Sequence, residues 1–341
     1  MSNGSNKKGI ITWAILATVF LAFSLAVNLG LFVMLIASSD PGMGTRYVPD
    51  SVFEEQVMGG ERRSHDKIAV IYVTGLISYS IDGAAGEGGM VSDIKEQLRV
   101  ASSDSSVKAI VLVVDSPGGE VTASDEIYRA VARVRDEKGL PVVVSMGALA
   151  ASGGYYVSMG GDYVMASEST ITGSIGVILQ TLNYRKLLEK IGVDIVTIKS
   201  GKYKDLLSGS REANPEEMKL VQDLILESYD QFVGIVAKER ELDLEELKST
   251  LAQGQIFSGR QAREKKLIDD LGYFEDAVKK AKELAGISQA RQVRYIAPPS
   301  LRKLLRLFSK SDQKTVKVQV GPEALKLQNG KLYYVAEQFL Q

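Results

Sequence analysis

The sequence contains no cysteine and only one histidine among its 341 residues. Without cysteine the chain has no disulfide, no thiolate metal site and no cysteine nucleophile. A serine nucleophile would have only His65 as an imidazole base, and His65 lies in a polar run, Arg62 to Lys67. We interpret His65 as an exposed linker residue. A serine hydrolase built on this sequence therefore needs a base other than histidine.

An excess of charge of one sign is also missing, because 41 Lys and Arg oppose 42 Asp and Glu. This balance gives a nucleic-acid partner no electrostatic support, and we expect none. The charge is unevenly distributed, since residues 291–341 hold ten Lys and Arg but only three Asp and Glu. We interpret 291–341 as a basic C-terminal tail that docks on a subunit, faces anionic lipid or is simply solvated.

Charged side chains are absent from residues 9–39. A helix needs about 20 apolar residues to cross a bilayer, whereas the apolar part of a signal peptide spans only about 7–15. We therefore predict a retained transmembrane anchor over 9–39. Lys7 and Lys8 precede it, while Asp40 and Asp50 follow it. By the positive-inside rule, residues 1–8 are cytoplasmic and the chain from Asp40 lies outside the cell (inner) membrane.

Beyond a polar linker over 40–66, apolar runs alternate with helical patterns. Strands are expected at 68–73, 109–114 and 142–144, and helices at 92–100 and between the last two strands. This alternation predicts an α/β domain over residues 67–290. Further along, Asn214-Pro215-Glu216-Glu217 has the pattern of a capped helix start and predicts a helix to about Arg240.

Three glycine-marked turns follow apolar runs, at Gly118-Gly119, around Ser152 and at Thr172 to Gly176. Glycine lets backbone N–H groups approach a ligand closely because no Cβ intervenes. A serine at a helix N-terminus gains from the helix dipole, and the N–H of the next residue can bind an oxyanion. Each turn alone is common between strands and helices, but their combination favours a catalytic interpretation.

Four longer runs contain these turns and a lysine-rich segment. In chain order they are Asp115-Ser116-Pro117-Gly118-Gly119, Ala151-Ser152-Gly153-Gly154-Tyr155-Tyr156, Thr172-Gly173-Ser174-Ile175-Gly176-Val177 and Ser200-Gly201-Lys202-Tyr203-Lys204-Asp205. In this order they resemble the bacterial signal peptide peptidase A family in its short, single-domain form. The resemblance covers roughly residues 68–285, and residues 254–278 are similar to a later segment of that family.

The resemblance implies a fold like that of the caseinolytic proteases and crotonases, built from stacked ββα units and preceded here by one transmembrane helix. It implies Ser152 as nucleophile and Lys204 as general base. Ser174 would orient the lysine amine, and the N–H groups of Gly119 and Gly153 would form the oxyanion hole. It implies no cofactor and no metal.

Lysine suits a protein without a usable histidine, provided that burial in an apolar site lowers the pKa of the amine. Lys199, Lys202 and Lys204 all lie in one segment, and only the family motif selects Lys204. In double-length relatives the serine and the lysine lie in different halves of the chain, whereas this short chain carries both. Residues 206–214, which we expect at the rim of the cleft, depart from the form that the resemblance leads us to expect after the lysine.

The resemblance to this family implies that the substrates are remnant signal peptides and that the protein forms a homo-oligomer. Residues 302–308 are amphipathic enough to lie on lipid or on a neighbouring copy. Alternatives are a stomatin-associated type of membrane Ser/Lys protease, a crotonase-type acyl-CoA enzyme and a non-catalytic membrane scaffold. Fluorophosphonate labelling separates the proteases from the last two, which should not react at Ser152.

Overall fold

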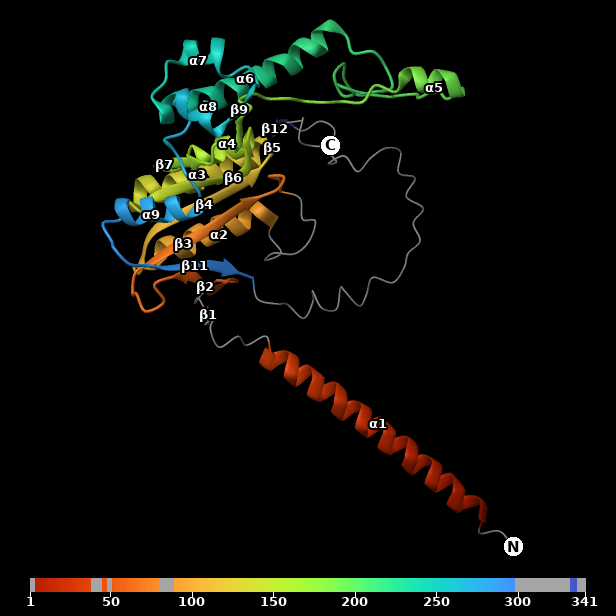
Figure 1. Cartoon of the computed structure of the whole chain (residues 1–341). Helices are drawn as coiled ribbons and strands as arrows, with labels where there is room; N and C mark the ends of the chain where they lie inside the picture. Colours follow the sequence, from red (N-terminus) through yellow and green to blue (C-terminus); the bar gives the residue numbers. More distant parts are fainter. Residues whose placement is uncertain (1–3, 38–44, 48–50, 80–88, 298–331, 336–341) are drawn as a thin grey trace. The chain divides into compact units, whose positions relative to one another are not determined.

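The computed structural model describes residues 4–37, 45–47, 51–79, 89–297 and 332–335 and contains two compact units, Met1–Arg46 and Tyr47–Gln341. The first unit is built on helix α1, Gly4–Ala37 (Figure 1). Within α1, Trp13–Leu31 has a mean hydropathy of 2.2 and is long and apolar enough to cross a membrane. The predicted anchor therefore coincides with a helix. The predicted amphipathic stretch 302–308 lies outside the described residues.

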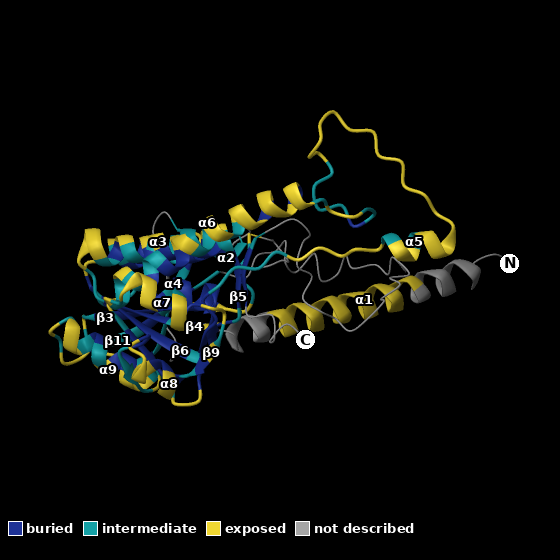
Figure 2. Ribbon diagram, turned by 90° about the horizontal axis from the view of Figure 1, so that it is seen from above, coloured by how far each residue is buried: buried dark blue, intermediate teal, exposed yellow. Residues whose placement is uncertain are grey.

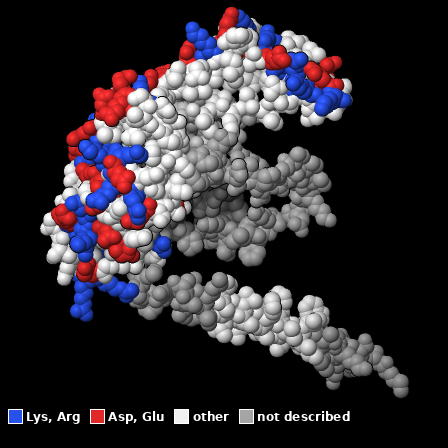
Figure 3. Space-filling model, turned by 45° about the horizontal axis from the view of Figure 1, so that its top comes forward, with Lys and Arg blue, Asp and Glu red and all other residues white. Residues whose placement is uncertain are grey.

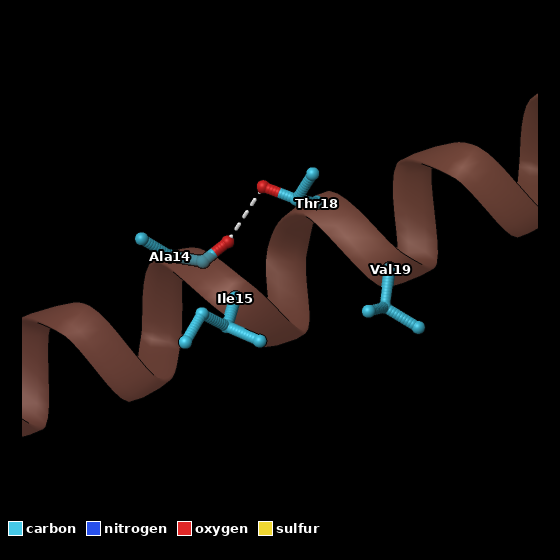
Figure 4. A pocket seen from close by; sticks show the side chains of 4 residues that line it. All are labelled: Ala14, Ile15, Thr18 and Val19. Atoms are coloured by element: carbon cyan, nitrogen blue, oxygen red, sulfur yellow. Dashed lines mark hydrogen bonds between the residues drawn. The ribbon is translucent and has the colours of Figure 1, made fainter.

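Two polar side chains in the apolar part of α1 bond to the backbone of the same helix. The Thr18 hydroxyl donates to the Ala14 carbonyl oxygen at 2.8 Å (Figure 4), and the Asn28 amide donates to the Ser24 carbonyl oxygen at 2.7 Å. Inside a bilayer an unpaired polar group is costly because no water replaces the lost partner. These internal hydrogen bonds therefore suit a helix surrounded by lipid.

The second unit is built around a twisted sheet with the strand order β2-β11-β3-β4-β6-β7-β10. These strands are β2 Glu54–Gly60, β3 Lys67–Thr74, β4 Val107–Ser116, β6 Val142–Ala151, β7 Tyr163–Ala166, β10 Asp270–Leu271 and β11 Arg291–Ile296. β3, β4 and β6 are parallel neighbours, and they confirm the predicted strands. The short β1, Thr45–Tyr47, precedes them.

Helices cover both faces of the sheet (Figures 1 and 2). Along β4, Ile110 and Leu112 face one apolar cluster and Ala109 and Val111 face the other, all fully buried. The first cluster includes side chains of α2, Gly89–Ser103, and α3, Val121–Lys138, and the second includes those of α9, Phe274–Leu284. The unbroken apolar run of β4 thus reflects a strand covered on both sides, as predicted.

The predicted helix start at Asn214 is confirmed as α6, Pro215–Arg240. The Asn214 side chain accepts a hydrogen bond from the Glu217 amide at 2.9 Å, and the Glu217 side chain accepts one from the Asn214 amide at 3.1 Å. In the C-terminal half of α6, Phe232 and Val236 are fully buried in the main apolar cluster. Beyond it lie α7 Leu244–Thr250, β9 Ile256–Ser258 and α8 Gly259–Glu264.

Strands also lie in the two segments for which the sequence predicted a linker and a tail. β2 falls within the predicted linker, 40–66, and β11 falls within the predicted tail, 291–341. β11 lies between β2, to which it is antiparallel, and β3, to which it is parallel. Both strands are rich in polar residues and form because they pair with partners far away in the sequence. The central sheet therefore includes strands on either side of residues 67–290.

Residues 180–214 leave the sheet unit and return to α6, and we call this segment the arm (Figures 1 and 2). The arm contains α5, Arg185–Ile191, and is exposed along most of its length. Its apolar side chains include Val196, which is 86% exposed, and Ile198, which is 96% exposed. Such exposure of large apolar side chains is typical of an interaction surface.

Candidate active site

Ser152 stands at the junction between β6 and α4, Gly153–Ser158, as the residue before the helix. Its backbone is held at φ 54 and ψ -115, a conformation that costs about 1–3 kcal/mol outside glycine and is common at functional sites. The side chain is fully buried, and its hydroxyl oxygen has no hydrogen-bond partner among the described residues. The strained backbone and the unsatisfied hydroxyl both lower stability, and both occur at the residue predicted to be the nucleophile.

The two glycines predicted to form the oxyanion hole lie together. Gly119 belongs to the short strand β5, Gly118–Glu120, and Gly153 opens α4. A Cβ added to Gly153 would lie 3.0 Å from the amide nitrogen of Gly119. A Cβ added to Gly118, whose φ is +101°, would lie 2.6 Å from the amide nitrogen of Gly153. Only glycine allows the two amides to approach this closely.

A strand from the C-terminal end of the chain lies along this glycine pair. β12, Tyr333–Val335, pairs antiparallel with β5 and places Tyr334 opposite Gly119. A Cβ on Gly153 would lie 3.0 Å from the Tyr334 carbonyl oxygen, and one on Gly118 would lie 2.0 Å from it. A peptide carbonyl of the chain itself thus lies beside both predicted oxyanion-hole glycines. The sequence analysis missed this strand, although the run Leu332 to Val335 is apolar.

The side chain of Tyr334 fills an aromatic pocket. Its ring stacks on Tyr156 with centroids 4.9 Å apart and packs against Phe232 at 4.7 Å. The Tyr334 hydroxyl donates to the Ser228 carbonyl oxygen at 2.9 Å, and the Tyr156 hydroxyl donates to Asp125 at 2.7 Å. Burial raises the pKa of Tyr334 well above its usual value, so the phenol stays neutral. The pocket therefore suits a large side chain with a polar tip.

Ser174 follows a strand that pairs with the backbone next to Ser152. It follows β8, Ile171–Gly173, which pairs with the end of β6 so that Gly173 lies opposite Ala151. Its backbone has φ 51, and its amide donates to the Gln255 carbonyl oxygen at 2.8 Å. Ser174 lines a pocket of about 420 Å³ together with the residues that follow it, Tyr229, residues 252–254 and Val335.

Lys204 lies on the exposed turn of the arm and does not bond Ser152 of the same chain. The neighbouring amines are occupied, because Lys199 donates to Asp205 at 2.6 Å and Lys202 pairs with Glu216. Within the described ranges the Lys204 amine makes no hydrogen bond or ion pair. The chain thus brings Ser152, Ser174 and the two glycines together and leaves Lys204 apart on the arm.

His65 lies on the turn between β2 and β3, with a side chain that is 86% exposed. Its nearest charged partner is Asp66, at 3.9 Å. The interpretation of His65 as an exposed residue is confirmed. An exposed imidazole cannot serve a buried hydroxyl, so the base has to come from elsewhere.

Comparison with known proteins agrees with this geometry. The profile of peptidase family S49 matches residues 134–288, and that of Clp protease matches residues 67–172. Over 256 residues the chain is 38% identical to a putative signal peptide peptidase SppA of Enterococcus faecium, covering 73% of the chain and 72% of the relative. It is 44% identical over 221 residues to the putative protease slr0021 of Synechocystis sp., covering 65% and 75%.

A third relative, protease 4 of Haemophilus influenzae, is 40% identical over 225 residues, which cover 66% of this chain but 36% of that protein. The expected α/β fold of the caseinolytic protease type is confirmed by the Clp protease match and the parallel sheet. The buried serine, the converging glycine amides and these relatives agree on one conclusion: the chain is a serine peptidase that belongs to peptidase family S49, the family of signal peptide peptidase A.

Proposed function

We propose that the protein is a membrane-anchored endopeptidase that cleaves remnant signal peptides with Ser152 as nucleophile and Lys204 as general base. The observation that carries this proposal is the pairing of β12 with β5, which places the Tyr334 carbonyl beside Gly119 and Gly153. A substrate peptide that adds to β5 as an extra strand would present its scissile carbonyl at the same place. The two amides would then stabilise the oxyanion as Ser152 attacks.

The dyad is completed, in this proposal, between two copies of the chain. Ser152 is buried without a partner, and Lys204 is exposed on an arm whose apolar side chains are uncovered. A second copy that covers the arm buries those side chains and brings its Ser174 pocket to the lysine. In the view of Figure 3, uncharged surface lies between the charged side of the sheet unit on the left and a second group of charges of both signs at the upper right. Burial at that interface would favour a neutral amine able to accept the serine proton.

Ser174 orients the Lys204 amine of the neighbouring copy in this arrangement. Its pocket of about 420 Å³ adjoins β12 and lies next to the backbone contact between Ser152 and Gly173. The arrangement also accounts for the expected homo-oligomer, since Ser152 and Lys204 of one chain do not meet. Ring-forming head-to-tail contacts supply one such interface to every copy.

The predicted membrane anchor supports both the proposed substrates of the peptidase and its proposed location. Residues 9–39 would hold the protein in the cell membrane with residues 1–8 in the cytoplasm and the peptidase domain outside. Signal peptides remain in that membrane after preprotein processing, so a tethered peptidase meets them by diffusion in the plane. Accessibility of the domain to protease added to spheroplasts checks the orientation, and full protection in sealed cells contradicts it.

Subunit complementation tests the dyad with the full-length protein in detergent. Ser152→Ala and Lys204→Met should each abolish hydrolysis of a fluorogenic peptide. Mixed oligomers of the two variants should recover about one site in four, because half of the serines survive and half of those meet an intact lysine. Inactive mixed oligomers would contradict a dyad shared between copies.

Two matched variants separate the roles of the basic residues. Lys202→Met removes a neighbouring exposed amine that pairs with Glu216 and should keep near wild-type activity. His65→Ala should do the same, because His65 is exposed away from the site. If His65→Ala were inactive and Lys204→Met active, histidine would be the base. Labelling of Ser152 by a fluorophosphonate excludes a scaffold or an acyl-CoA enzyme, and unreactive wild-type protein would favour one of them.

A further inference from the structure

The hydroxyl of Ser116 links the turn after β3 to the Gly118-Gly119 turn of the candidate site. Ser116 ends β4 and is fully buried. Its hydroxyl donates to the Gly75 carbonyl oxygen at 2.6 Å and accepts a hydrogen bond from the Gly118 amide at 3.0 Å. One side chain thus links the turn after β3 to the start of β5. The reaction proposed above uses Gly119 of the same motif and gives Ser116 no part.

The order of amides in this turn explains why a hydroxyl is needed there. Pro117 has no N–H to donate. The Gly118 amide is taken up by Ser116, so Gly119 is the first residue whose amide can face the strand paired with β5. The Gly118-Gly119 peptide is held on its other edge by Ile77, whose amide donates to the Gly118 carbonyl oxygen at 2.9 Å. The Ser116 hydroxyl holds the Gly118 amide, and Ile77 holds the Gly118 carbonyl. Together they fix the orientation of Gly118 and so the direction of the Gly119 amide that follows it.

Ser116 also contacts the element that carries the second amide. A Cβ on Gly154 would lie 2.8 Å from the Ser116 carbonyl oxygen and 3.4 Å from its Cβ, so this part of α4 packs directly on Ser116. In the sheet, Ser116 lies opposite Ala150 on β6, two residues before Ser152. Ser116 thus contacts Gly118 and Gly154, the neighbours in sequence of the two predicted oxyanion-hole glycines.

We propose that Ser116 is a positioning residue that sets the separation and direction of the Gly119 and Gly153 amides. This inference rests on the proposed function of Ser152 and of the two glycines. Ser116 does not touch the reacting atoms and acts through the Gly118 amide. Misplacement of a catalytic group by about 1 Å can cost about a hundredfold in rate, and loss of one oxyanion donor costs about a hundredfold to a thousandfold. Removal of the Ser116 hydroxyl should therefore slow turnover rather than weaken peptide binding.

The test compares Ser116→Ala with Ser158→Ala in the full-length protein. Ser158 is an equally buried serine on α4 whose hydroxyl donates to the Gly154 carbonyl oxygen at 2.8 Å. For Ser116→Ala we expect kcat for a fluorogenic peptide to fall about tenfold to a hundredfold with KM within about twofold. Affinity for a peptide boronic acid, which forms a tetrahedral adduct at the serine, should fall by the same factor. Ser158→Ala should change neither value beyond about twofold.

Three outcomes overturn the inference: an unchanged kcat, an equal effect of Ser158→Ala, or a loss confined to KM. If Ser116→Ala does not fold, Ser116→Cys decides, because the thiol keeps the shape and weakens both hydrogen bonds. A reduced kcat with unchanged KM supports the inference, and wild-type kcat overturns it. Failure of the proposed function looks different, since the wild-type protein would then neither hydrolyse the peptide nor react with a fluorophosphonate.

Discussion

The amide of Ser152 donates a 2.7 Å hydrogen bond to the carbonyl oxygen of Gly173. This contact fastens the strained turn of the nucleophile to β8, and the residue after Gly173 is Ser174. Ser152 and Ser174 are therefore held at a fixed separation by a backbone hydrogen bond. The position of the nucleophile relative to the Ser174 pocket does not depend on a flexible side chain.

Gly118→Ala should abolish peptide hydrolysis. The new Cβ would lie 2.0 Å from the Tyr334 carbonyl oxygen and 2.6 Å from the Gly153 amide nitrogen, in a backbone region that alanine rarely adopts. We expect kcat to fall at least about a hundredfold, because the oxyanion donors are pushed apart. The control is Gly139→Ala, which has φ +60° but open space around it. It should lose about 1 kcal/mol of stability and keep its activity.

Ser152→Gly should stabilise the fold while abolishing catalysis. Glycine relieves the strain at φ 54 and removes a buried hydroxyl that has no partner among the described residues. The net gain in the free energy of unfolding should be about 1 kcal/mol after the greater flexibility of glycine in the unfolded chain is included. Urea unfolding measures it. Ser158→Ala, which removes a satisfied hydrogen bond, should instead lower the free energy of unfolding. Equal losses of stability in both variants would show that the backbone at Ser152 is not strained.

Tyr334→Ala should free the peptide-binding edge of β5. The substitution empties the aromatic pocket between Tyr156 and Phe232 and removes the hydrogen bond to Ser228. Because β12 would then compete less with added peptide, KM for a short peptide should fall several-fold. Tyr273→Ala, at a tyrosine that is 69% exposed, is the control and should leave KM unchanged. An unchanged KM for Tyr334→Ala would mean that peptides bind elsewhere.

Asp104 should make stability depend on acid pH. Burial alone would raise the pKa of Asp104, but hydrogen bonds from Lys67 and Ser106 outweigh it and lower the pKa to about 2. A carboxylate whose pKa is lower in the folded state stabilises the protein above its unfolded pKa of about 4. That contribution is lost as pH falls from about 4 to about 2.

The stability difference between wild type and Asp104→Asn should therefore be present at pH 7 and vanish near pH 2. Chemical unfolding at a series of pH values measures this difference. Asp230→Asn is the control, because Asp230 forms an exposed pair with Lys248 and should change stability by less than about 1 kcal/mol at any pH. A difference for Asp104→Asn that persists unchanged at pH 2 would contradict the assignment.

Local patterns were sufficient to predict the central strands and the capped start of α6. β4 is apolar at successive positions because both faces are covered, and α6 begins at Asn214 because that side chain caps it. The glycine turns could be predicted for a similar reason. The close approach of Gly118 and Gly153 requires the absence of a Cβ, and a sequence records that requirement directly.

Features that depend on remote pairing could not be predicted in this way. β2 and β12 are too short or too polar to stand out, and each exists because of a partner strand elsewhere. The arm is the opposite case. Val196 and Ile198 are apolar yet exposed, so a rule that buries apolar residues misplaces them. The separation of Lys204 from Ser152 in one chain follows from this exposure, and spacing in the sequence carries no sign of it.

The place of β11 in the sheet constrains the order of folding. The chain is synthesised from its N-terminus, so β3 and β4 can pair early. β11 is synthesised after every other strand in the β2-β11-β3-β4-β6-β7-β10 order. Until then β3 has an uncovered edge, and β2 lacks the neighbour that holds it. Such long-range pairing folds slowly and leaves a strand edge open to wrong partners. A chain stalled or cut before Arg291 would therefore lose the strand that joins β2 to the rest of the sheet.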